Sequence, residues 1–143
     1  QVSPYAPGCR RLPETDLQRG PATAHAVAQA ISEGQVYAAH DASEGGVLLA
    51  AAEMAFAGGI GLQLDMAAMQ GDLASISVAC FAETPSRYLL EVCPNGLEAL
   101  TASLGNVPHR VIGNFDDSGR VHGEGIDCTL NELHDAWANG MQI

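Results

Sequence analysis

The segment VLLAAAEMAFA, residues 47–57, is the feature that most constrains how this chain can fold. It is apolar on nearly every side of a helix, and many of its side chains are the small methyl groups of alanine. A helix of this kind is buried, and short side chains let it pack closely on a sheet. We therefore expect a buried helix over residues 45–57, with Leu49 in the core. Glu53 is the exception, and it either faces a ligand or lies at an exposed rim near the helix end.

The remaining periodicity predicts helices and strands on both sides of this helix. Helices are expected over 21–33, from Asn95 and Gly96 to Gly105, and over NELHDAWANG, with Asn131 as cap and Leu133 and Trp137 pointing inward. Strands are expected over 36–40 (buried), 60–65, 75–81, 87–92, 110–115 and 120–125, the last two joined as a hairpin by DDSG. Residues 66–75 are ambiguous. This order predicts an α+β fold, an α/β sandwich in which helices flank a mixed β-sheet.

The start of the chain differs in composition from the rest. Residues 1–20 are rich in proline and predict an extended lead-in or linker. The remaining residues, 21–143, are enough for one domain with a core of its own. Because the sequence opens on Gln1 in a loop-like run, we interpret the chain as a fragment of a longer protein.

Charge and cysteine usage limit the classes of partner and compartment. Six basic residues, all arginines, stand against seventeen acidic residues, giving a formal net charge of -11. Nucleic acid and anionic membranes are repelled by such a chain, so neither is an expected partner. The apolar run at 47–57 is also shorter than the roughly 20 residues that span a bilayer. Four scattered cysteines without a CxxC pair are typical of reduced thiols in a cytoplasmic protein.

The polar loop before the apolar helix, HDASEGG at 40–46, is the strongest candidate site. The first turn of a helix presents free N–H groups, and glycines allow an anion to approach the backbone, so Ser43, Gly45 and Gly46 are candidates for binding a phosphate. Asp41 and Glu44 repel a bare phosphate, and a Mg²⁺ ion held by Asp41 would remove that repulsion. The alternative is that Ser43 only caps the helix.

A second group of candidates lies in FAETPSRYLLEV, where Glu83, Thr84 and Arg87 place an acid, a hydroxyl and a base on one turn. A local salt bridge is the alternative explanation for these residues. The five histidines have no metal-binding spacing, and no nucleophile motif accompanies them.

Together these segments resemble the phosphoribosylformylglycinamidine synthases of purine biosynthesis, which are formylglycinamide ribonucleotide amidotransferases. AHDASEGGVLLAAAEMAFAGGIGLQLD is similar to the family pattern HDxSxGGL…AEMA…G…G…ID, and FAETPSRYLLEV to FSESxGRxLVxV. HRVIGNF and the Leu133…Trp137 ending also resemble family segments. The resemblance covers about residues 20–140, and it is to the C-terminal domain that these enzymes share with aminoimidazole ribonucleotide synthetase.

The resemblance implies ATP-dependent amidation of formylglycinamide ribonucleotide, with ammonia supplied by a glutaminase subunit or domain. It implies that an upstream half of the same protein binds most of the ATP, so that this chain alone is inactive. By the same resemblance, Asp41 matches a Mg²⁺ ligand, while Glu83, Thr84 and Arg87 belong to a segment that contacts the ribonucleotide substrate. Ala82, Thr84 and Ser86 depart from that segment, where the family has serine, serine and glycine.

Two other interpretations stay open at this point. The chain could be a non-catalytic scaffolding or docking module, in which the loop is only a helix cap. It could also belong to another member of the superfamily, such as a selenophosphate synthetase-like enzyme. The apolar helix further suggests a face that docks on the missing half or self-associates.

Overall fold

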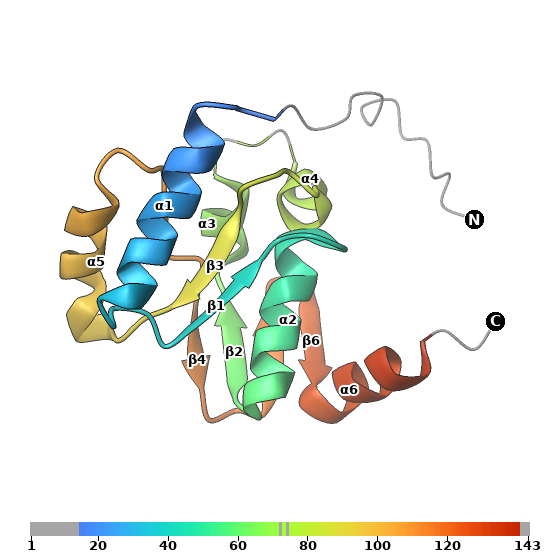
Figure 1. Ribbon diagram of the computed structural model, residues 1–143. Helices are drawn as coiled ribbons and strands as arrows, with labels where there is room; N and C mark the ends of the chain where they lie inside the picture. Colours follow the sequence, from blue (N-terminus) through green and yellow to red (C-terminus); the bar gives the residue numbers. More distant parts are fainter. Residues whose placement is uncertain (1–14, 72, 74, 141–143) are drawn as a thin grey trace.

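The computed structural model describes residues 15–71, 73 and 75–140 (Figure 1). Its helices are α1 (Arg19–Ser32), α2 (Gly46–Gly58), α3 (Met66–Gln70), α4 (Ile76–Phe81), α5 (Leu97–Leu104) and α6 (Leu130–Asn139), with a short 3-10 helix at Pro94–Gly96. Its strands are β1 (Ala38–Asp41), β2 (Gly61–Leu64), β3 (Tyr88–Glu91), β4 (Gly113–Asp116), β5 (Arg120–Gly123) and β6 (Ile126–Thr129). Most of the predicted lead-in, residues 1–14, lies outside the described part.

The strands form two sheets, and the predicted mixed α/β architecture is confirmed. A four-stranded sheet has the order β4-β2-β5-β6, in which β2 and β5 are parallel and the other neighbours are antiparallel. A separate antiparallel pair joins β1 to β3. In Figure 1, α2 crosses in front of the four-stranded sheet, while α1 and α5 lie beside each other to the left of the two-stranded sheet.

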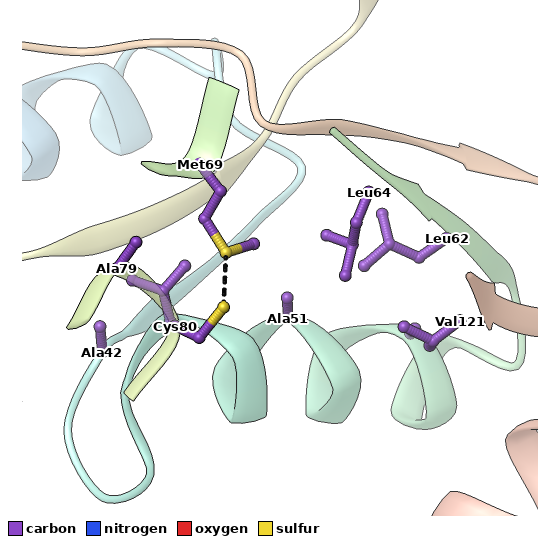
Figure 2. Close-up of a cluster of buried hydrophobic side chains, with 10 residues drawn as sticks. Ala42, Ala51, Leu62, Leu64, Met69, Ala79, Cys80 and Val121 are labelled. Carbon is purple, nitrogen blue, oxygen red and sulfur yellow. Dashed lines mark hydrogen bonds between the residues drawn. The ribbon is translucent and has the colours of Figure 1, made fainter. Parts of the chain in front are cut away.

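The main core forms where α2 packs on the sheet and on the short helices α3 and α4. Ala51 of α2 faces Leu62 and Leu64 of β2, and Figure 2 shows these side chains converging with Val121 of β5. At the other end of the cluster, the Cys80 thiol donates to the sulfur of Met69 at 3.5 Å. Burial raises the pKa of the Cys80 thiol, as expected for a structural cysteine.

The predicted helix at 45–57 is confirmed, and most of its circumference is buried, since Ala50 and Ala52 are buried as well as Ala51. Val47, Ala51 and Ala55 face the core, whereas Leu49 is 42% exposed. The prediction for Leu49 is therefore wrong. The face made of small side chains is the one that allows α2 to approach the sheet closely, and the bulkier leucine lies outside it. Within the described residues no helix has the length and apolar character needed to cross a membrane.

The prediction of a strand over 75–81 is also wrong, because this segment is helix α4. The Ser75 side chain accepts a hydrogen bond from the N–H of Val78 and so caps the helix. One side of the turn is buried through Ala79 and Cys80, while Phe81 is 59% exposed. The β-branched sequence favours a strand locally, but the cap and the packing of α4 against α2 and α3 decide the conformation.

The predicted hairpin over 110–125 does not form, because β2 lies between β4 and β5. The turn itself exists, but it carries the chain across the start of β2, directly over Gly61. A Cβ atom on Gly61 would collide with the side chains of Asp116 and Ser118. Asp116 holds this crossing by accepting from the N–H of Ser118 at 2.9 Å and by pairing with His122 at 2.8 Å. The observed hairpin joins β5 to β6 instead.

Three smaller predictions need correction. The cap of α6 is Thr129 and not Asn131, since Thr129 and Glu132 form a reciprocal capping box. Trp137 is 63% exposed and contacts the ring of Phe56 from the outside, although Leu133 does pack against the core as predicted. In addition, the strand expected over 36–40 begins at Ala38 and alternates between half-buried and exposed residues.

The burial pattern predicts different costs for two leucine truncations. Leu62→Ala should lower the free energy of unfolding by about 2–5 kcal/mol because it leaves a cavity between α2 and the sheet. Leu49→Ala should cost less than about 1 kcal/mol because that side chain already contacts water. Urea denaturation of both variants checks this, and equal losses would contradict the placement of α2.

The crossing over β2 predicts that Gly61 does not tolerate a side chain. Gly61→Ala should cost on the order of 1–3 kcal/mol because the added methyl group displaces the turn at Asp116–Gly119. Gly96→Ala is the matched control, since a Cβ there has only the Cys93 side chain at 4.0 Å. If thermal unfolding shows the same stability for both variants, the crossing is not where the structure has it.

Candidate functional site

The loop after β1 and the segment before β3 line one cavity of about 360 Å³. Its walls are Asp41–Glu44 on one side and Glu83–Tyr88 on the other. The antiparallel pairing of β1 with β3, in which Asp41 lies opposite Tyr88, brings the two segments together. The structure therefore brings Asp41 and Ser43 together with the segment 83–87 at one cavity, whereas Gly45 and Gly46 do not line it.

A second hollow of about 500 Å³ lies elsewhere, between the start of α1 and the end of α5. It is lined by Asp16, Arg19, Leu104 and their neighbours and includes none of the residues singled out by the sequence. The smaller cavity is the better candidate because polar groups from two segments converge on it.

The backbone donors of the loop are not all available to a ligand. The N–H of Gly45 donates to the Glu83 carboxylate at 3.0 Å, and the N–H of Gly46 donates to the Ser43 carbonyl at 3.2 Å. Within the described part of the chain, the N–H groups of Ser43 and Glu44 have no protein acceptor. Among the N–H groups of cavity-lining loop residues, these two are the ones left for an anion. Binding a phosphate at Gly45 would require Glu83 to move away.

Ser43 does not cap α2, so that interpretation of its hydroxyl group is wrong. The capping residue is Gly45, in the left-handed region at φ 75°, and no side chain caps this end of the helix. The hydroxyl of Ser43 lies at the exposed cavity wall and has no hydrogen-bond partner among the described residues. It is thus free to bind an oxygen of a ligand.

Gly46 is required by packing between helices. Its φ is 72°, and a Cβ atom would lie 2.6 Å from the carbonyl oxygen of Cys80 and 2.8 Å from the carbonyl carbon of Phe81. The absence of a side chain lets the first turn of α2 lie directly against the backbone of α4. This contact fixes the loop 42–45 relative to the opposite cavity wall.

Arg87 supports the same wall through its side chain. Its guanidinium group donates to the carbonyl oxygens of Ala79 and Ala82, both at 3.2 Å, which satisfies the C-terminal end of α4. Partial burial, and to a lesser degree the nearby Arg110, lowers the pKa of Arg87. Among the described residues Arg87 forms no salt bridge with Glu83, so the predicted local ion pair is not present.

Ser86 and Thr84 complete this wall. Ser86 has a positive φ of 63°, a conformation that favours glycine and costs other residues about 1–2 kcal/mol. The family that this chain resembles has glycine at this position, and the positive φ explains why glycine is favoured there. Thr84 lines the cavity half-buried.

Sequence analysis assigned no role to His40, and the structure gives its ring three contacts. Its Nδ1 lies 2.7 Å from the carbonyl oxygen of Asp41 and 3.7 Å from the carboxylate of the same residue, and its Nε2 lies 3.3 Å from the Glu53 carboxylate. Glu53 neither lines the cavity nor lies at an exposed rim, so neither of the two roles considered for it is observed. The alternation of side chains along β1 could have predicted the contact with Glu53, because it places His40 on the opposite face of the strand from Asp41.

The carboxylates around the cavity do not form a metal site made only of protein ligands. No group of three or more His, Cys, Asp or Glu side chains in the described residues could hold a metal ion. Asp41 lines the cavity with its side chain 65% exposed. This arrangement fits Mg²⁺, which binds through one or two carboxylates together with phosphate oxygens and water.

Comparison with known proteins identifies the family and the fold of this chain. The family model described as AIR synthase related protein, C-terminal domain, matches residues 8–126. The phosphoribosylformylglycinamidine synthase subunit PurL of Corynebacterium aurimucosum is 39% identical over 105 residues, covering 72% of this chain and 13% of that protein. PurL of Thermomicrobium roseum is 33% identical over 131 residues, covering 90% of this chain and 18% of that protein. The chain thus spans less than a fifth of these relatives.

Solved structures show the same fold. Phosphoribosylformylglycinamidine synthase II of Thermotoga maritima superimposes with a TM-score of 0.72 at 18% identity, covering 85% of this chain and 22% of that one. The T. maritima PurL complexed with FGAR gives a TM-score of 0.71 over 83% of this chain and 21% of that one, also at 18% identity. The resemblance to the synthases is confirmed, and the chain belongs to the family of AIR synthase-related C-terminal domains.

Proposed function

We propose that this chain is the C-terminal-type domain of a cytoplasmic phosphoribosylformylglycinamidine synthase, a ligase of purine biosynthesis. Such an enzyme uses ATP to convert formylglycinamide ribonucleotide into formylglycinamidine ribonucleotide. The observation that carries the proposal is the meeting of the Asp41–Glu44 loop and the Glu83–Tyr88 segment at one cavity. Both segments carry the resemblance to the family, and they are far apart in the sequence.

The residues of this chain would bind and orient a phosphate group of the nucleotide or of the ribonucleotide substrate. The N–H groups of Ser43 and Glu44 and the Ser43 hydroxyl are the available donors, and the dipole of α2 favours an anion there. Asp41 would hold Mg²⁺ at the edge of the loop. Bound Mg²⁺ would neutralise the charge that develops on the transferred phosphoryl group. Thr84 and Arg87 would face the substrate from the opposite wall.

The partners follow from the same proposal. An upstream half of the protein would supply the main ATP site, and a glutaminase subunit or domain would deliver ammonia. T. maritima PurL has been solved complexed with ATP and with ADP, and a T. maritima PurLQS structure is also known. Together with the relatives named PurL, these structures support ATP, the ribonucleotide and further subunits as the binding partners.

A non-catalytic module is the second candidate function, and one contact favours it. The Glu83 carboxylate already occupies the N–H of Gly45, which a phosphate at the helix start would use. A domain that only scaffolds the enzyme, or that docks on the upstream half or on a second copy, could keep this contact permanently.

The role of Asp41 predicts that ADP binding depends on metal. Wild type should bind ADP about tenfold more tightly with Mg²⁺ than without it, because Asp41 and a phosphate share the ion. Asp41→Asn should lose most of this difference, and its metal-free affinity should rise because one repelling charge is gone. Asp135→Asn removes a carboxylate on α6 as the control. Calorimetric titration of all three proteins tests this, and equal ADP affinity with and without Mg²⁺ in wild type would refute the proposed site.

The contact of Glu83 separates the two candidate functions. Glu83→Ala frees the N–H of Gly45 and removes a negative charge, so affinity for ADP without metal should rise by roughly threefold. Glu124→Ala, on the turn between β5 and β6, removes the same charge away from the cavity and should change little. No gain for Glu83→Ala over this control would favour the scaffolding function.

A further inference from the structure

His40 and Glu53 form a contact between β1 and α2 that the proposed binding of phosphate does not use. The Nε2 atom of His40 lies 3.3 Å from the Glu53 carboxylate, with side chains 33% and 28% exposed. Neither residue lines the cavity. The Nδ1 atom of His40 also lies 3.7 Å from the carboxylate of Asp41, which does line the cavity, so the effect of the pair reaches the site through Asp41.

The His40 ring also holds the peptide unit between Asp41 and Ala42 through a hydrogen bond. The carbonyl oxygen of Asp41 can only accept, so the Nδ1 atom of His40, 2.7 Å away, must carry the proton of this hydrogen bond. On the other side of the same peptide unit, the N–H of Ala42 donates to the carbonyl oxygen of Arg87 at 2.9 Å. Both polar groups of the peptide are thus held, one by the His40 ring, which contacts α2, and one by Arg87, the residue just before β3.

We propose that Glu53 and His40 are positioning residues that hold the backbone at Asp41, and with it the carboxylate that would bind the metal. This inference rests on the proposed function of the loop. Glu53 orients the His40 ring, the ring fixes the Asp41 carbonyl group, and the fixed backbone limits where the exposed carboxylate can lie. Partners of this kind, one step removed from a ligand, tune metal affinity without touching the metal.

Stability alone does not explain the presence of Glu53 in α2. The rest of the helix is apolar, and leucine has about the same helix propensity as glutamate. Even a fully charged pair at such partly exposed positions would contribute little to folding, typically below about 1 kcal/mol. A glutamate at this position is therefore better explained by its contact with His40.

The proposal is tested with two substitutions at the same residue. Glu53→Leu removes the contact, whereas Glu53→Gln keeps a polar group that can bond to Nε2. Because both lose the negative charge, a difference between them separates positioning from electrostatics. With Mg²⁺ present, Glu53→Leu should weaken ADP binding by about 3- to 10-fold, and Glu53→Gln should stay within about twofold of wild type. The melting temperature of Glu53→Leu should be unchanged or higher.

A double-mutant cycle tests the order of the contacts. His40→Leu should weaken Mg²⁺-dependent ADP binding as Glu53→Leu does, and the double variant should show no further loss. Glu98→Leu, an exposed glutamate on α5, is the control for losing one charge and should bind as wild type does. Equal affinities for the leucine and glutamine variants at position 53, or additive losses in the double variant, would overturn the proposal.

A second measurement keeps the test decisive if wild type shows no Mg²⁺-dependent ADP binding, a result that would defeat the proposed function. The amide resonances of the loop report the backbone directly. Glu53→Leu should shift the amide signals of Ala42 and Ser43, while Glu53→Gln should leave them near their wild-type positions. Unchanged signals in Glu53→Leu would overturn the positioning role independently of any ligand.

Discussion

The close approach of α2 to its neighbours is the constraint on which the rest of the structure depends. Ala51 and Ala55 let the helix lie against β2, and Gly46 lets its first turn touch the backbone of α4. A larger side chain at any of these positions would push the helix outward. The position of the loop before α2 depends on this packing, because the loop is short and ends at Gly46. The candidate site is therefore built by core packing as much as by its own polar residues.

The loop itself is held at several points and left open at two. The peptide after Asp41 is bonded on both sides, and the N–H groups of Gly45 and Gly46 have partners within the protein. What remains is a pair of adjacent donors, at Ser43 and Glu44, beside an exposed carboxylate. A rigid loop with few free donors is suited to bind one anion in one orientation, since little entropy is lost on binding. The acidic surroundings make that binding depend on a cation.

The sequence allowed the helix at 45–57, strands β2 and β3 and the mixed α/β class to be predicted, because their apolar periodicity agrees with their environment. It also singled out both walls of the cavity. The predictions failed where the conformation depends on contacts between residues that are far apart in the sequence. Ser75 caps a helix in a β-branched segment, β2 separates two strands that local turn chemistry would pair, and Leu49 lies on the exposed side of α2. The bond from Glu83 to Gly45 joins residues 38 positions apart, and no local pattern encodes it.

The central claim is that an anion binds at the N–H groups of Ser43 and Glu44, and amide chemical-shift mapping tests it most directly. We expect ADP with Mg²⁺ to shift the amide signals of these two residues most, followed by Gly45 as Glu83 is displaced. The amide of Ala42, which is bonded to Arg87, should move little. Shifts confined to the hollow between α1 and α5, or no shifts at saturating ADP and Mg²⁺, would contradict the account.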